Sequence, residues 1–315
     1  MLKKIIAVCL CLPLILAVAA GCKKENDRLT VVCSVFPVYD WVRNIVGDRE
    51  AVDVKLLVDD GSDIHSFQPT ARDAIDIKEA DLVVRVGGVD DDFIGELAKN
   101  GEGADLRLST CEGVTLRETS LSSSHSHTDH SSHDHPVDEH IWLSLKNAAA
   151  CAEAICEALS ELDPDGEAVY RENADKYIEK LTTLDARFAD AVNGASNKRA
   201  VFADRFPFVY LAEDYGIEYE AAFEGCSADA EEGFDTIIRL ADKLDEWELS
   251  YIFVTESSDM GLANAVADRA EGSGISVAVL DSMQSVSKDS DDKDYISIME
   301  NNLDTLSAVL SGKES

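Results

Sequence analysis

Five side chains that can bind a metal ion lie at or beyond the ends of stretches of sequence typical of β-strands. They are His65, His140, Asp204, Glu256 and Asp281. Imidazole and carboxylate groups suit Zn²⁺ or Mn²⁺, and these five can supply four to six bonds. If the strands are parallel, their carboxyl ends meet and the five side chains converge on one cleft. The alternative for each acid is structural, since Asp at a strand end often caps the next helix.

Strand-like and helical patterns alternate from residue 29 onward, which predicts βα units with parallel strands. An apolar stripe from Tyr170 to Ala191 predicts one long helix over residues 166–194. We therefore expect an α/β protein of two lobes, each a four-stranded, mostly parallel sheet flanked by helices, joined by one long rigid helix. The expected strands are 29–35, 52–58, 81–86, 105–109, 199–204, 217–223, 250–256 and 275–281, with a closing helix over 294–310.

The residues on both sides of His65 and His140 also predict helices. Thr70-Ala-Arg-Asp73 has the form of a capping box, so a helix is expected to begin just after the loop that carries His65. The alanine-rich segment 145–162 predicts another helix just after His140. The expected domains are an N-terminal lobe over 29–165, the linking helix over 166–194 and a C-terminal lobe over 195–315.

The first 21 residues have the order of a secretory signal. Lys3 and Lys4 precede an apolar run that ends in Ala-Ala-Gly before Cys22, the pattern of a bacterial lipoprotein signal. Lipid on Cys22, followed by a tether over 22–28, would hold the mature protein at the outer face of the cytoplasmic membrane. A transmembrane anchor is disfavoured because the run contains Pro13 and is shorter than the roughly 20 residues that span a bilayer.

The charge of the chain limits its partners. With 62 acidic and 28 basic residues, the formal net charge is −34 at pH 7. Such a surface repels phosphate backbones, which excludes nucleic acid as a partner but is compatible with a cationic ligand. A monomer is expected.

The segment 122–135 contains five histidines between Ser, Thr and Asp residues. It cannot form a core and is expected to be disordered without metal. Irregular spacing makes it a poor rigid cage, but flexible imidazoles bind late transition metals weakly. We expect a weak metal collector, the alternative being a passive linker; its histidines are His125, His127, His130, His133 and His135.

Four segments of the chain resemble the metal-binding solute-binding lipoproteins of zinc and manganese ABC importers (ZnuA/TroA-like). DDGSDIHSFQPT (59–70) is similar to the G-x-D-x-H-x-[FY]-x-P-T loop of the family, and DEHIWLSLKNA (138–148) to its D-P-H-x-W-L-x-P-x-N-A loop. VAVLDSM resembles the strand that delivers an aspartate ligand, and TESSD resembles a T-E-P-x stretch. The resemblance implies one metal clamped between two α/β lobes, with His65 and His140 from the N-terminal lobe and Asp281 from the C-terminal lobe.

The fourth ligand is where the sequence departs from the family. The family usually has His or Glu five residues ahead of a tyrosine, and Arg205 stands there, which cannot lose its proton or bind a cation. Arg205 is expected to pair with a neighbouring acid such as Asp204 or Glu256. The open alternatives for the fourth ligand are Asp204, Glu256, water and Cys226.

The function that these patterns favour is a lipid-anchored extracellular receptor that captures Zn²⁺, or alternatively Mn²⁺, and hands it to an ABC importer permease. No enzymatic activity is expected. One alternative is a surface adhesin or assembly lipoprotein with a structural metal. The other is an extracellular metallohydrolase, which the absence of H-E-x-x-H and G-x-S-x-G motifs disfavours.

Overall fold

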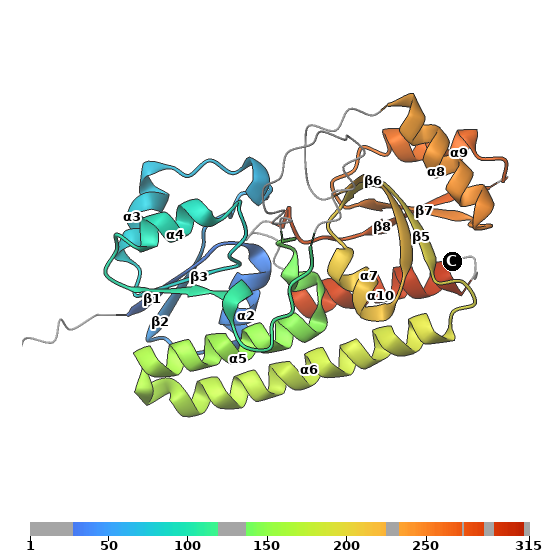
Figure 1. Ribbon diagram of the computed structural model, residues 1–315. Helices are drawn as coiled ribbons and strands as arrows, with labels where there is room; N and C mark the ends of the chain where they lie inside the picture. The colour runs from blue at the N-terminus through green and yellow to red at the C-terminus, as the bar shows by residue number, and fades with distance from the viewer. Residues whose placement is uncertain (1–27, 119–136, 225–232, 273, 287–292, 312–315) are drawn as a thin grey trace, which may run out of the picture.

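Two parallel four-stranded sheets form the centres of two lobes, and one long helix runs along both (Figure 1). The computed structural model describes residues 28–118, 137–224, 233–272, 274–286 and 293–311. The signal segment, Cys22, Cys226 and the five histidines of segment 122–135 lie outside these residues. The expected α/β architecture of two lobes is confirmed.

The sheet of the N-terminal lobe has the strand order β2-β1-β3-β4, with all neighbours parallel. The central strand β1 is apolar and its last three residues are buried, as expected for a strand covered on both faces. The strands are β1 (Leu29–Cys33), β2 (Val52–Leu56), β3 (Leu82–Arg85) and β4 (Ala104–Arg107), and the helices are α2 (Phe36–Val46), α3 (Ala71–Glu79), α4 (Asp92–Ala98) and α5 (Leu145–Leu162).

The C-terminal lobe repeats this arrangement with the order β6-β5-β7-β8, again all parallel. The expected strands are found with shifts of one or two residues at their ends. They are β5 (Arg199–Phe206), β6 (Glu218–Glu224), β7 (Tyr251–Thr255) and β8 (Ser276–Leu280), and the helices are α7 (Val209–Tyr215), α8 (Phe234–Glu246), α9 (Gly261–Arg269) and α10 (Tyr295–Leu310).

The linking helix α6 (Glu167–Gly194) buries a stripe that contacts both lobes. Toward its start, the Tyr177 hydroxyl donates a hydrogen bond to Asp40 of α2, at 3.1 Å. Toward its end, the ring of Phe188 stacks on Tyr215 of α7, with 5.2 Å between ring centroids. The two halves of this apolar stripe therefore pack against different lobes.

The lobes also share a hydrophobic core beyond the linking helix. Trp41 of α2 packs edge-on against Tyr295 at the start of α10, with ring centroids 5.4 Å apart. The Tyr295 hydroxyl donates a 2.5 Å hydrogen bond to the backbone carbonyl of Trp142, and both side chains are buried. Among the described residues, no helix has the length and apolar character needed to cross a membrane.

Candidate metal site

His65 lies on a single 3-10 turn, Ile64–Ser66, that follows strand β2. The carboxylate of Asp63 caps this turn by accepting a hydrogen bond from the backbone N–H of His65, at 3.1 Å. Helix α3 then begins at the predicted capping box, in which Thr70 and Asp73 exchange backbone-to-side-chain hydrogen bonds. Local hydrogen bonds therefore fix the loop that carries His65.

His140 is almost completely buried, directly ahead of the 3-10 turn Ile141–Leu143. The Oδ1 atom of Asp138 accepts hydrogen bonds from both the backbone N–H and ring Nδ1 of His140, each at 2.9 Å. The ring also packs edge-on against Trp142, with centroids 5.0 Å apart. Since a buried polar group is costly unless paired, Asp138 holds His140 in one orientation.

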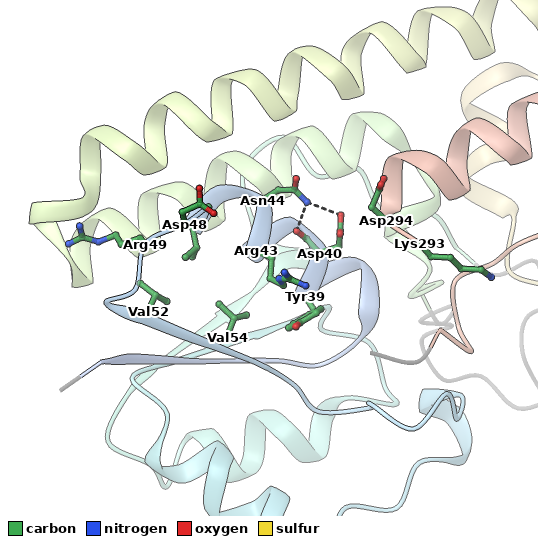
Figure 2. Close-up of a pocket in the computed structure, with 12 residues that line it drawn as sticks. Tyr39, Asp40, Arg43, Asn44, Asp48, Arg49, Val52, Val54, Lys293 and Asp294 are labelled. Carbon is green, nitrogen blue, oxygen red and sulfur yellow. Dashed lines mark hydrogen bonds between the residues drawn. The ribbon is translucent and has the colours of Figure 1, made fainter. Parts of the chain in front are cut away.

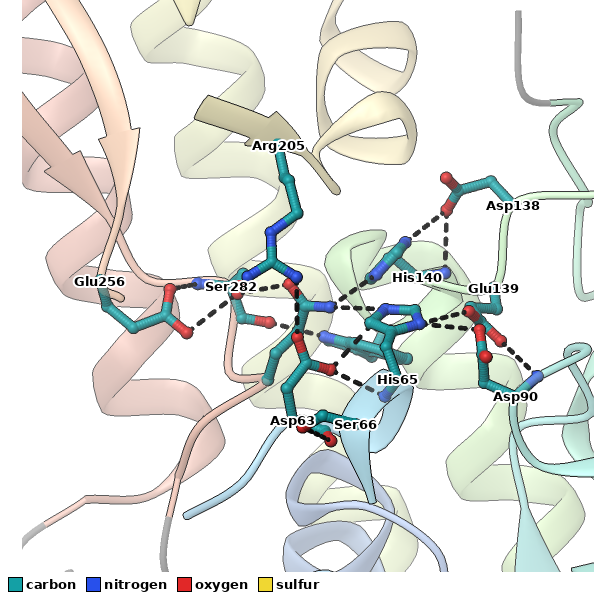
Figure 3. A network of polar contacts seen from close by, with 12 residues as sticks. Asp63, His65, Ser66, Asp90, Asp138, Glu139, His140, Arg205, Glu256 and Ser282 are labelled. Atoms are coloured by element: carbon teal, nitrogen blue, oxygen red, sulfur yellow. Dashed lines mark hydrogen bonds and ion pairs between the residues drawn. The ribbon is translucent and has the colours of Figure 1, made fainter. Parts of the chain in front are cut away.

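The two imidazole rings lie next to each other, with 5.6 Å between their centroids (Figure 3). Each ring Nδ1 faces a carboxylate: His65 faces Asp90 at 2.7 Å and His140 faces Asp138 at 2.9 Å. A carboxylate accepts hydrogen bonds, so each neutral imidazole carries its hydrogen on Nδ1 and a lone pair on Nε2. Both Nε2 atoms approach the amide nitrogen of Gln284 from the C-terminal lobe, at 2.9 and 3.0 Å.

This arrangement is the one that a metal-binding histidine pair requires. Zn²⁺ is bound by neutral imidazole nitrogen, and a carboxylate on the other ring nitrogen fixes the tautomer and raises the basicity of the ligand. His65 and His140 meet both conditions, and their lone pairs point to one place. The expectation that these two histidines lie together is confirmed, while their role as ligands stays a prediction.

Two acids behind His65 were not predicted as part of the site. Among the described residues, His65, Asp90 and Glu139 are the one group of at least three His, Cys, Asp or Glu residues whose ligand atoms lie within 4.8 Å of one another. Burial raises the pKa of Glu139 to about 8, and its hydrogen bond with Asp90 contributes to this rise. The same hydrogen bond lowers the pKa of Asp90. Asp90 lies in an Asp-Asp-Asp run after β3 and Glu139 is adjacent to His140, but in so acidic a chain neither signal is specific.

The three predicted carboxylates from the C-terminal lobe make other hydrogen bonds. Asp204 accepts from the backbone and hydroxyl of Thr255, at 3.2 and 2.7 Å, which ties β5 to β7. Glu256 accepts from the backbone and hydroxyl of Ser282, and burial raises its pKa.

Asp281 caps its own turn by accepting from the backbone N–H of Met283, at 2.9 Å, and lies 3.5 Å from Lys293. Its backbone is held on both sides by the side chain of Asn302. None of the three acids belongs to a group of metal-ligand atoms within 4.8 Å among the described residues. Metal binding by any of them would have to compete with these hydrogen bonds.

The expected partner of Arg205 was wrong. The guanidinium forms an ion pair with Asp63 of the N-terminal lobe, at 3.3 Å between Nη1 and Oδ2, and not with Asp204 or Glu256. The contact between Asp204 and Arg205 is a hydrogen bond from the Arg205 backbone N–H, because the Asp204 carboxylate also turns toward Thr255 of β7. Figure 3 shows the guanidinium reaching toward Asp63.

A separate cavity of about 580 Å³ is lined by residues of α2 and β2 and by the two residues that precede α10 (Figure 2). Its charged lining contains as many basic as acidic side chains, so it is no concentrated cation site. The deepest of these is Asp40, which receives hydrogen bonds from Asn44, Tyr177 and the backbone of Tyr295. The charged lining residues are Arg43, Arg49, Lys293, Asp40, Asp48 and Asp294.

The chain is similar along most of its length to metal-binding proteins of bacteria. The zinc-binding lipoprotein AdcA of Streptococcus pneumoniae (strain ATCC BAA-255 / R6) is 29% identical over 310 residues, which cover 97% of this chain and 60% of AdcA. This chain therefore spans about 60% of the length of that relative.

Two solved structures share the fold along nearly their whole length. The Zn(II)-bound ZnuA-like domain of Streptococcus pneumoniae AdcA is 27% identical, with a TM-score of 0.72, and 90% of this chain and 99% of that chain are covered. A serine-to-alanine mutant of a Mn-bound periplasmic metal binding protein from Candidatus Liberibacter asiaticus is 26% identical, with a TM-score of 0.73 and coverage of 89% and 99%. The model of the family described as zinc-uptake complex component A, periplasmic, matches residues 31–309. These matches confirm the resemblance seen in the sequence, and the chain belongs to this ZnuA family.

Proposed function

We propose that this protein is an extracytoplasmic receptor that binds one Zn²⁺ ion between its lobes and delivers it to the permease of an ABC importer. One observation carries the proposal: the Nε2 atoms of His65 and His140 approach a common point, and both Nδ1 atoms are held by carboxylates. The metal is cargo, and no chemical step on a substrate is proposed. The family is named for zinc uptake and not for catalysis, which agrees with this assignment.

Zinc is favoured over manganese by the ligand types. Imidazole nitrogen suits Zn²⁺, whereas Mn²⁺ prefers carboxylate, carbonyl and water oxygen. The two imidazoles direct their lone pairs to one point, and their Nδ1 atoms contact Asp90 and Asp138. These contacts hold both rings in the orientation that metal binding needs. Mn²⁺ is the alternative cargo if oxygen ligands from the C-terminal lobe dominate.

Asp281 is the proposed carboxylate ligand from the C-terminal lobe. It lies three residues before Gln284, whose amide contacts both imidazoles, and it is the acid that the resemblance to the family assigns as a ligand. Metal would compete for this carboxylate with the hydrogen bond from Met283 and the contact with Lys293. Asp204 and Glu256 are the other candidates, and each already accepts hydrogen bonds on both of its carboxylate oxygens.

The segments outside the described residues complete the proposal. Lipid on Cys22 would tether the receptor to the outer face of the cytoplasmic membrane, beside the permease that it serves. The five histidines of segment 122–135 would collect zinc weakly; they are His125, His127, His130, His133 and His135. The receptor would act as a monomer.

The test is zinc uptake in cells that lack the chromosomal copy of this gene. Cells that carry the wild-type chain should regain uptake of radioactive zinc and growth under zinc limitation. His140→Ala should abolish this rescue, while Cys22→Ala should weaken it by releasing the protein from the membrane. Full rescue by His140→Ala, with the protein at normal abundance, would contradict the proposal.

A further inference from the structure

Gln284 occupies the point at which the two imidazoles converge. Its amide nitrogen lies 2.9 Å from Nε2 of His65 and 3.0 Å from Nε2 of His140. Both ring nitrogens accept, because their Nδ1 hydrogens face Asp90 and Asp138. An amide NH₂ group has two hydrogens, so Gln284 can donate one to each ring. The amide thus takes the place of a cation between the two lone pairs.

The other end of the amide contacts a second polar network. Gln284 Oε1 lies 3.0 Å from the hydroxyl oxygen of Ser282, and this hydroxyl lies 2.9 Å from Oε1 of Glu256. Ser282 has one hydroxyl hydrogen for these two acceptors. If the amide turned over, its NH₂ group would donate to the Ser282 oxygen, and the Ser282 hydrogen would go to Glu256. Both orientations of the amide therefore find partners at this end.

The loop that carries Gln284 is held firmly in the cleft. The backbone carbonyl of Ser282 accepts a hydrogen bond from the indole N–H of Trp142 in the N-terminal lobe, at 2.9 Å. Glu256 accepts from the Ser282 backbone N–H at 2.8 Å, and Met283 adopts a left-handed backbone conformation with φ of 62°. A non-glycine residue keeps such a conformation only where its surroundings enforce it. The loop thus fixes the backbone, while the terminal torsion of the Gln284 side chain is soft.

We propose that Gln284 is a two-position ligand of the cleft: its NH₂ group bridges the imidazoles when no metal is bound, and its Oε1 atom binds the metal after the amide turns over. A cation between the rings would repel the NH₂ group and attract the carbonyl oxygen, so metal binding itself favours the turn. The inference rests on the proposed function. In this arrangement Gln284 supplies a ligand from the C-terminal lobe, which Arg205 cannot do. The metal affinity then depends on Gln284.

The two positions of the amide can be observed directly by NMR, because the chain contains only two glutamines, Gln68 and Gln284. Gln68 is exposed and serves as an internal reference. In protein labelled with ¹⁵N-glutamine, one equivalent of Zn²⁺ should shift the side-chain NH₂ signals of Gln284 and leave those of Gln68 in place. Unshifted Gln284 signals at full zinc occupancy would overturn the inference.

Binding measurements distinguish a side chain that binds the metal from one that the metal only displaces. Gln284→Met keeps the length of the side chain but removes the oxygen, and it should weaken Zn²⁺ binding on the order of 10- to 100-fold. Gln284→Glu is the matched control, since it keeps an oxygen at the same place, and it should bind at least as tightly as wild type. Equal or tighter binding by Gln284→Met would show that the amide is only displaced, which would overturn the inference.

The outcomes distinguish this inference from the proposed function. If wild-type protein binds one Zn²⁺ that requires His65 and His140, but Gln284→Met binds equally well, the receptor assignment stands and only the role of Gln284 fails. If wild-type protein binds no such zinc, both fail. Circular dichroism of Gln284→Met and Gln284→Glu should match that of wild type, because their backbone anchors are unchanged.

Discussion

Arg205 and Asp63 form an ion pair across the cleft, with 3.3 Å between Nη1 and Oδ2. Asp63 also caps the turn that carries His65. The guanidinium from the C-terminal lobe therefore contacts the acid that positions a proposed metal ligand of the N-terminal lobe. The position that the resemblance compares with a family ligand thus holds a positive charge, paired with the acid that caps the turn of His65. We infer that Arg205 limits the affinity of the site for a cation.

Replacing Arg205 should therefore change zinc affinity in a defined order. Arg205→His removes the charge and supplies an imidazole, so Zn²⁺ should bind more tightly, by roughly tenfold or more, about 1.4 kcal/mol. Arg205→Ala removes the charge and the ion pair without adding a ligand, and is the control. Competition with a chromophoric zinc chelator gives both affinities. Binding by Arg205→His no tighter than by Arg205→Ala would show that this position cannot reach the metal.

Asp281→Asn tests the proposed carboxylate ligand. The amide oxygen can still accept from Met283 N–H, so the loop should keep its shape while the ligand loses its charge. Zinc affinity should fall on the order of 10- to 100-fold. Asp204→Asn is the matched comparison: it should lower the free energy of unfolding through the Thr255 contacts but leave zinc affinity unchanged. The reverse pattern in the two variants would move the ligand assignment from Asp281 to Asp204.

The pH dependence of stability should report on Asp40, which joins α2, α6 and α10. Burial raises its pKa to about 6, against an ordinary value near 3.9 in the unfolded chain. Between these two pH values the folded protein keeps a proton on Asp40 that the unfolded chain has lost. The contribution of this proton to the free energy of unfolding is therefore complete below about pH 4 and is lost as pH rises through about 6. Its neighbours, Arg43, Asp294, Tyr177 and Tyr295, act more weakly than burial.

Asp40→Asn removes this titration and is the variant to compare with wild type. Urea unfolding should show wild type losing on the order of 2 kcal/mol relative to Asp40→Asn between pH 4.5 and pH 8. Comparing the two proteins cancels the general effect of the high net charge, which changes with pH in both. Parallel stability curves over this range would contradict the raised pKa.

Much of the fold follows from local sequence patterns. β-branched runs predicted all eight strands, and the stripe that begins at Tyr170 predicted α6 to within one residue at its start. The capping box at Thr70 was found because its hydrogen bonds join residues only three apart. Periodicity and capping are local properties, so they can be read without knowledge of the tertiary structure.

The contacts that complete the site could not be predicted in this way. Arg205 finds its partner 142 residues away, in the other lobe, because Asp204 beside it turns toward β7. Gln284 lies three residues beyond Asp281, but its sequence carries no sign that its amide meets two imidazoles. Asp90 is one of 62 acids, and only the packing of the lobe selects it as the partner of His65.

The shared core predicts that metal causes little change in the overall shape. Trp41 packs on Tyr295, and the Tyr295 hydroxyl binds the Trp142 carbonyl, so wide opening would expose buried rings from both lobes. The continuous helix α6 resists hinge motion as well. Solution scattering of zinc-loaded and chelator-treated protein should give radii of gyration that agree within error, with unchanged circular dichroism. A large compaction on zinc addition, or unfolding after chelation, would contradict this account.

The most direct test of the central claim is a calorimetric Zn²⁺ titration of three proteins: wild type, His140→Ala and a deletion of residues 122–135. Wild type should bind one zinc tightly and further zinc weakly. His140→Ala should lose the tight equivalent, and the deletion should lose only the weak ones. A tight equivalent that disappears with the loop and persists without His140 would contradict the assignment of the metal to the cleft.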